Sequence, residues 1–349
     1  MSPALPSLAE ALAADPEARS RHLLVLRAGT EPAELGELAA ARFTAARWEA
    51  PAGSVPSADD DGPRVLRLSR HSSLLGPFAV GRSESMDLQL PVWGELAFVV
   101  RSPRERGEPP WEVGGDRDGL KRVFAAGMPT RDEGRVVEWL VDAARHLEGA
   151  VRFGEPAAVV VPDPLAAVDV TVYSGVWLEP EAALHVAQRL APQSRLAMDA
   201  HEWTGPARPD LSALGITPLP EPQRLELHEL VDAEDLEVLS GPDVLDGYGV
   251  EIDLDIDGLV AIEAFGEEEP PPAVLAMPWA SGGVVAYRVS WVWEDEEEAH
   301  LEKPPMHFRV ARGRAASLVE GIVRGLAAAT EPSLALTPAG FRVRGAAPR

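Results

Sequence analysis

The chain has 349 residues, a length that fits two domains or one large one, and 46% of them are hydrophobic, as in ordinary globular proteins. It contains no cysteine, which excludes disulfides, thiol nucleophiles, thiolate zinc sites and iron–sulfur clusters. Its formal net charge is −24, and residues 221–300 hold 22 acidic side chains against two basic ones, Arg224 and Arg288. A negative field this regional argues against nucleic acid and anionic membranes as partners and favours a cationic one, such as a basic protein.

Almost all basic residues are arginines, and the only lysines are Lys121 and Lys303. Neither lysine follows a glycine-rich loop that could cradle phosphates, so a nucleotide-dependent phosphotransferase is not expected. The abundance of Ala, Gly, Pro and Arg is typical of GC-rich bacterial coding. The chain opens with no secretory leader and has no apolar stretch near the ~20 residues of a membrane span, so the sequence predicts a cytoplasmic protein.

The first part of the chain alternates helix-like and strand-like segments. Ser7 and Glu10 form a capping-box pattern, which predicts a helix near the start. Apolar residues at helical spacing predict another helix over Glu31–Ala46. Short apolar runs predict strands at Leu23–Leu26, Val65–Leu68, Phe78–Val80 and Leu96–Val100.

The strongest helical pattern lies at Thr130–Gly149. Thr130 and Glu133 have the spacing of a capping box, and Gly149 stands where a helix ends. Two strands are expected next, at Ala157–Val161 and Val168–Trp177. The segment Pro180–Leu190 is expected to be helical, with its proline in the first turn. Five prolines in residues 204–222 then predict a long connection.

The acidic region after this connection has the alternation of an antiparallel sheet. Tyr248–Phe265 is predicted to be a hairpin with Ile256-Asp257-Gly258 as its loop. That register pairs Leu254 with Val260, Ile252 with Ile262 and Val250 with Ala264. A further strand is expected at Val285–Trp293 and a helix at Arg314–Ala329.

These elements predict an α+β fold, with mixed or antiparallel sheets and packed helices. Each half ends with strands followed by a long helix, which suggests two similar modules. The predicted division is residues 1–150 for an N-terminal α+β module and residues 151–349 for a C-terminal one. The second module contains the proline-rich connection 204–222 and the acidic antiparallel sheet within 221–300.

The acidic hairpin also contains a weak candidate metal site. Asp253, Asp255 and Asp257 precede Gly258 with the spacing of a calcium-binding EF-hand loop. Position 12 of such a loop should be glutamate, and here it is Ala264. The flanking segments also alternate like strands, so the expected structure is a hairpin with an acidic solvent face and no bound metal or cofactor.

No catalytic signature stands out, and the sequence favours a non-enzymatic role. Asp199, His201 and Glu202 lie close together and could ligate a metal or transfer protons, so a metal-dependent hydrolase is one alternative. A structural subunit of an assembly is another. Neither alternative can be decided from the residues alone, and the sequence does not predict the oligomeric state.

Aromatic and acidic residues adjoin at the end of the predicted sheet, and this segment is the candidate interaction surface. Aromatic side chains often anchor interfaces, and charges accelerate encounter with a partner of opposite sign. The leading hypothesis is therefore a protein-interaction module of the antitoxin or immunity type, or an assembly subunit. The residues of this surface are Trp291, Trp293, Glu294, Asp295, Glu296, Glu297 and Glu298.

Overall fold

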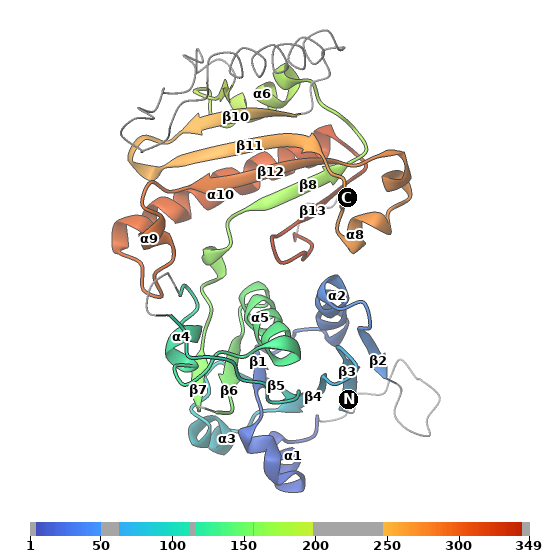
Figure 1. Cartoon of the computed structure of the whole chain (residues 1–349), viewed down its shortest axis with the longest axis vertical. Coiled ribbons are helices and arrows are strands. Elements are labelled where there is room, and N and C mark those ends of the chain that lie inside the picture. Colours follow the sequence, from blue (N-terminus) through green and yellow to red (C-terminus); the bar gives the residue numbers. More distant parts are fainter. Residues whose placement is uncertain (1–4, 50–62, 112–115, 156, 198–246, 344–349) are drawn as a thin grey trace, which may run out of the picture.

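Seven antiparallel strands form the first sheet of the computed structural model, which describes residues 5–49, 63–111, 116–155, 157–197 and 247–343. Their order across the sheet is β2-β3-β4-β5-β1-β6-β7 (Figure 1). The interior strand β1 is buried on both faces, because each face of the sheet is covered by helices. The strands are β1 Leu23–Leu26, β2 Arg47–Glu49, β3 Arg64–Arg67, β4 Ser73–Ala79, β5 Leu96–Arg101, β6 Ala150–Phe153 and β7 Ala158–Val160.

Helices α2 (Pro32–Arg42) and α5 (Arg131–His146) cover the face of this sheet that looks toward the rest of the chain (Figure 1). Helix α1 (Leu8–Ala14) and the residues after α3 (Arg82–Asp87) pack on the opposite face. The short helix α4 (Leu120–Val123) precedes α5. The first module therefore has two hydrophobic cores, one on each side of its sheet.

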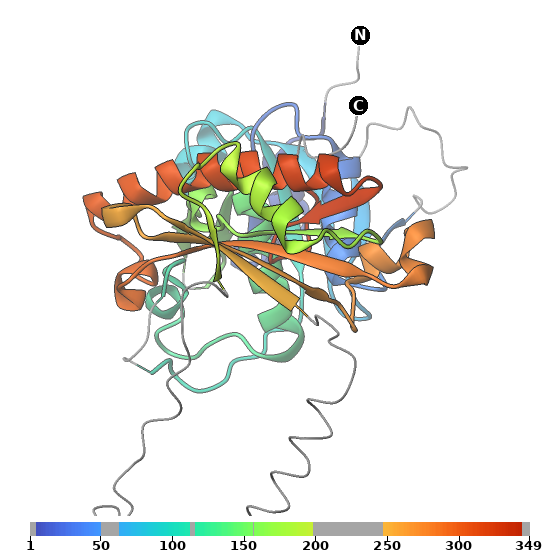
Figure 2. The same ribbon diagram turned by 90° about the horizontal axis from the view of Figure 1, so that it is seen from above.

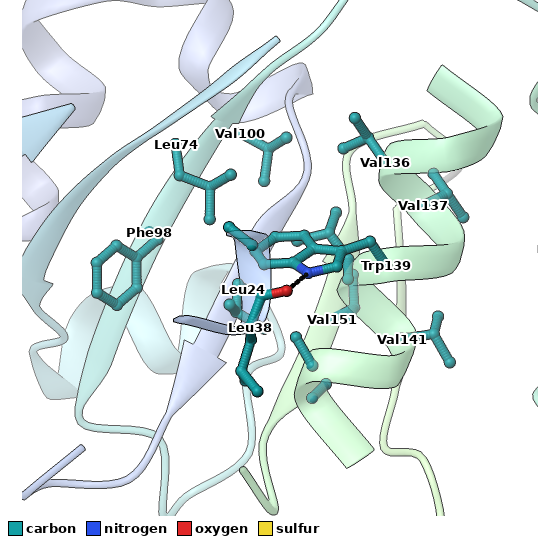
Figure 3. Packing of buried hydrophobic residues seen from close by; sticks show 14 of the residues in the cluster. Leu24, Leu38, Leu74, Phe98, Val100, Val136, Val137, Trp139, Val141 and Val151 are labelled. Atoms are coloured by element: carbon teal, nitrogen blue, oxygen red, sulfur yellow. Dashed lines mark hydrogen bonds between the residues drawn. The ribbon is translucent and has the colours of Figure 1, made fainter. Parts of the chain in front are cut away.

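Trp139 is the largest fully buried side chain and lies at the centre of the core between α2, α5 and the sheet. Its indole N–H donates a hydrogen bond to the Leu38 carbonyl at 3.0 Å, which ties α5 to α2. Figure 3 shows its ring among aliphatic side chains that come from the helices and from several strands. One residue thus supplies both packing and a specific link between two helices.

The second sheet has six antiparallel strands in the described part of the chain, in the order β13-β8-β12-β11-β10-β9. Helices α6 (Pro180–Gln188) and α10 (Met306–Ala329) lie across one face, and Figure 2 shows α10 spanning the sheet. The short helices α8 (Pro272–Leu275) and α9 (Glu296–Ala299) flank strand β12. The strands are β8 Val170–Ser174, β9 Arg195–Leu196, β10 Gly247–Asp253, β11 Leu259–Gly266, β12 Val285–Val292 and β13 Ser333–Leu336.

Two tyrosines fasten the connection after β8 to the second sheet. The Tyr287 hydroxyl accepts a hydrogen bond from the Leu178 N–H at 2.7 Å and donates one to the Val176 carbonyl at 2.8 Å. The Tyr248 hydroxyl donates to the Leu178 carbonyl at 2.7 Å. Burial raises the pKa of both hydroxyls, so both remain protonated and able to donate at neutral pH.

Replacing Tyr287 by phenylalanine is expected to lower the free energy of unfolding by about 1–3 kcal/mol, because the Leu178 N–H and the Val176 carbonyl, both in part-buried hydrogen bonds, lose their partner. Tyr248→Phe should cost less, since its hydroxyl serves only the Leu178 carbonyl. Urea unfolding followed by circular dichroism measures both losses. A larger loss for Tyr248→Phe than for Tyr287→Phe would contradict this account of the connection.

The six strands of the second sheet have the topology of β1–β6 in the first, to which β7 adds an edge strand. The two sheets with their packed helices confirm the α+β class. If β8–β13 are matched in sequence to β1–β6, the strand order is identical. Helices α2 and α6 each follow the first strand after five residues and begin at a proline, Pro32 or Pro180. Helices α5 and α10 each precede the sixth strand by three residues. The two modules therefore resemble each other in the order of their strands and in the lengths of these two connections.

The chain passes from the first sheet to the second between Val160 and Val170, beyond the boundary that the sequence predicts at residue 150. Strands β6 and β7 both follow residue 149 and both belong to the first sheet. The connection contains a 3-10 helix at Pro164–Ala166. The predicted proline-rich connection, residues 204–222, lies outside the described residues.

The predicted capping box at the start of α5 is wrong. Thr130 is the N-cap residue by position, but its hydroxyl donates to the Glu105 carbonyl at 3.3 Å, and its side chain makes no cap hydrogen bond. Glu133 turns into the protein, where its carboxylate accepts a hydrogen bond from the Glu105 N–H at 2.7 Å. Helix α10 also begins earlier than predicted, at Met306 and not at Arg314.

The predicted hairpin exists, but its register differs by two residues. Val250 pairs with Ile262, and Ile252 pairs with Val260. The connection is longer than predicted because a 3-10 turn at Asp255–Asp257 extends it, with Asp255 taking the positive φ of 53°. An even shift keeps every side chain on its predicted face, so the apolar residues still face the core.

Candidate functional site

The residues of the predicted interaction surface gather where β12 ends and α9 begins, but they divide into buried and exposed positions. Trp291 packs against Phe308, with ring centres 5.2 Å apart, and against Trp293 at 5.5 Å. Its indole N–H donates to the Asp257 carbonyl at 2.8 Å. Trp291 is therefore a packing residue that supports the surface from beneath.

Trp293 belongs to a small network with Glu298 and His307. Its indole N–H donates to Glu298 Oε2 at 3.1 Å, and His307 Nε2 lies 2.9 Å from the same oxygen. Asp295 caps α9, because its carboxylate accepts hydrogen bonds from the N–H groups of Glu297 and Glu298. These contacts fix the backbone of the acidic run and one of its carboxylates.

Glu294 and Glu297 differ from their neighbours, since both side chains are exposed and neither makes a polar contact within the described residues. The side chain of Glu296 is not among those that the structure describes. Together with their neighbours they surround a broad hollow of about 710 Å³, here called the acidic hollow. Its lining residues are Trp293, Glu294, Asp295, Glu297, Glu298 and His307.

The acidic hollow offers two kinds of attraction to a cation. Its four carboxylates create a negative local potential. Among the described residues that line the hollow, only His307 is basic. The face of an aromatic ring such as Trp293 also attracts a guanidinium or ammonium group. The arrangement thus suits lysine or arginine side chains, and its rim carboxylates are free to move toward them.

The candidate metal ligands in the hairpin are not brought together. Asp257 forms an ion pair with Arg314 at 2.9 Å, and Asp253 accepts a hydrogen bond from the Asp255 N–H at 2.9 Å. Within the described ranges, no group of three or more histidine and carboxylate side chains is placed to hold a metal ion. The residues of the hydrolase alternative, Asp199, His201 and Glu202, lie outside the described residues.

A second concave feature, here called the inter-module cavity, lies between the two modules. It has a volume of about 460 Å³ and is lined by Trp291 and Phe308, which pack against Trp293 of the acidic hollow. Helix α5 contributes Arg145 and His146, and α10 contributes Arg312. Sequence reasoning missed this site, because its residues come from segments far apart in the chain and form no local motif.

Among the described residues that line the inter-module cavity, Asp169 is the one whose carboxyl has a raised pKa. Burial raises the pKa of this carboxyl. The hydrogen bond from the Trp291 backbone N–H and the positive charges of Arg117 and Arg288 oppose the rise. A buried carboxyl in a cavity is a recurrent feature of ligand-binding and catalytic sites. The Asp169 carboxyl oxygens give the cavity hydrogen-bond acceptors beside the guanidinium groups.

Comparison with family models, with curated proteins and with solved structures finds no match for this chain. Among the helices of the described ranges, none is long and apolar enough to cross a bilayer.

Proposed function

We propose that this chain is a cytoplasmic protein-interaction module that binds a basic protein through the acidic hollow. The observation that carries the proposal is the combination at one place of four lining carboxylates and an aromatic ring, with no arginine or lysine among the described residues that line the hollow. Five of its six described lining residues lie in the segment 221–300, which holds 22 of the acidic side chains of the chain. An antitoxin-like or immunity-like role fits this chemistry, because such partners are often basic.

The local backbone supports the proposal, because the site is held ready to bind. The Asp295 cap fixes α9, and the Trp293–Glu298–His307 network fixes the floor of the hollow. Glu294 and Glu297 remain exposed at its rim. Fixed aromatic anchors bordered by exposed charges are the arrangement that favours fast and specific association.

Reversing both rim charges, with Glu294→Lys and Glu297→Lys together, is expected to slow association with the basic partner about tenfold at low salt. The dependence of the association rate on salt should also become shallower. Surface plasmon resonance with the partner immobilised measures both quantities. These positions make no internal polar contact in the described structure, so stability should change little.

The matched control is Glu268→Lys with Glu269→Lys, which changes the net charge by the same amount. These exposed residues follow the end of β11 that pairs with Val285, and the hollow lies beyond the other end of β12. If the control slowed association as much as the rim variant, the effect would come from net charge and the acidic hollow would not be the binding site.

A further inference from the structure

The inter-module cavity is lined by both modules and by the connection between them. Arg42, Asp142, Arg145 and His146 come from the first module, and residues 166–169 come from the connection. Trp291 and Arg312 come from the second. Its volume of about 460 Å³ lies within the ~300–1,000 Å³ that small-molecule sites occupy.

Guanidinium groups outnumber carboxylates on the cavity wall, although the chain as a whole has a formal charge of −24. Two of these groups are buried and held in place, since the side chains of Arg145 and Arg312 are each 5% exposed. The guanidinium of Arg145 forms ion pairs with the carboxylates of Asp118 and Asp142, each with an N–O distance of 2.5 Å, and Arg312 forms one with Asp163. Within the described residues, the Nε of each guanidinium has no hydrogen-bond partner.

Arg117 also lines the cavity and is far more accessible than Arg145 and Arg312. Its side chain is 38% exposed, and its Nη1 donates to the Ala166 carbonyl at 2.8 Å. Its nearest carboxylate, Asp118, is 3.9 Å from Nε and is already bound to Arg145. Arg117 can therefore turn toward an anionic group without leaving a buried carboxylate unpaired.

Three aromatic side chains, Trp291, Phe308 and Phe341, also line the cavity, together with several small apolar residues. Arg312 lies 5.3 Å from the centre of the Phe308 ring, so the charged and aromatic parts of the wall adjoin. The backbone N–H of Trp291 donates a hydrogen bond to Oδ1 of Asp169 at 3.0 Å. The other oxygen of this carboxyl makes no hydrogen bond in the described structure and can meet a polar group on a ring.

We propose that the inter-module cavity binds a small molecule that carries a planar ring and an anionic group, with the size of a nucleoside monophosphate. Arg117, with Arg145 and Arg312 behind it, meets the anionic group. The aromatic side chains contact the ring, and Asp169 hydrogen-bonds its polar edge. This site is separate from the acidic hollow and does not depend on the function proposed for that surface.

Isothermal titration calorimetry on the full chain tests the proposal with four kinds of probe: nucleoside monophosphates, aromatic carboxylates, uncharged nucleosides and inorganic phosphate. At least one anionic ring compound is expected to bind with one-to-one stoichiometry, about tenfold or more tightly than an uncharged nucleoside or phosphate alone. The compound that binds best distinguishes a phosphate ligand from a carboxylate ligand. No heat with any anionic ring compound at about 1 mM would overturn the proposal.

Variants assign the binding to the cavity. Arg117→Gln should weaken it about tenfold, and Arg324→Gln, which removes an exposed arginine from α10, should leave it unchanged. Ala166→Trp should abolish it by filling the cavity without altering charge. Wild-type affinity in Arg117→Gln or in Ala166→Trp, with either variant shown to be folded by circular dichroism, would place the binding elsewhere.

Discussion

Replacing Glu133 by alanine is expected to lower the free energy of unfolding by about 3–5 kcal/mol. The Glu133 side chain is 2% exposed and forms an ion pair with Arg106 at 2.8 Å. Its carboxylate also lies 3.2 Å from His22 Nε2. Since His22 Nδ1 accepts a hydrogen bond from the Gly154 N–H, Nε2 carries the proton and donates to Glu133. The substitution removes the ion-pair partner of the half-buried Arg106 guanidinium, and it leaves the His22 imidazole and the Glu105 N–H without their acceptor.

The matched control is Glu138→Ala on the same helix. Its carboxylate pairs with Arg42 across exposed surface, with side chains 59% and 41% exposed, so the loss should stay below about 1 kcal/mol. Chemical denaturation followed by circular dichroism measures both variants. Equal losses for Glu133→Ala and Glu138→Ala would show that the buried cluster does not hold α5 to β1.

Replacing Trp139 by alanine is also expected to cost about 3–5 kcal/mol, because it opens a large cavity in the main core of the first module. The Leu38 carbonyl also loses its buried donor. Trp111→Ala is the matched control: the same substitution at a side chain that is 82% exposed should change stability by less than about 0.5 kcal/mol. A small loss for Trp139→Ala would mean that the core of the first module repacks around the gap.

The elements predicted correctly are those whose signals are local. Strand β1 is a run of apolar residues, and α6 begins at Pro180, where the sequence predicts it. Strand β6 was missed because it is short and contains Arg152, a buried arginine that interrupts the apolar pattern. The Arg152 guanidinium donates to the Arg19 carbonyl at 3.1 Å, a partner that no local pattern reveals. The early start of α10 was missed for a similar reason, since Arg312 in its first half is buried.

The same distinction applies to the candidate sites. The acidic run was visible in the sequence, but only the structure separates the packing role of Trp291 and the capping role of Asp295 from the exposed Glu294 and Glu297. The inter-module cavity had no sequence signal, because α5, α10 and the connection meet only in the folded chain. The shared topology was likewise hidden, since strand order is a property of pairing and not of residue pattern.

The most direct test of the proposed function is capture of the partner from the lysate of the host. Three baits are compared: the wild-type chain, the rim variant Glu294→Lys/Glu297→Lys and the control Glu268→Lys/Glu269→Lys. Washes at low and then at physiological salt, about 150 mM, probe the electrostatic part of the binding. We expect one basic protein to be retained in equal amount by the wild-type and control baits, released as salt rises, and lost from the rim variant. Retention of that protein by the rim variant, or no retained protein on the wild-type bait, would contradict binding through the acidic hollow.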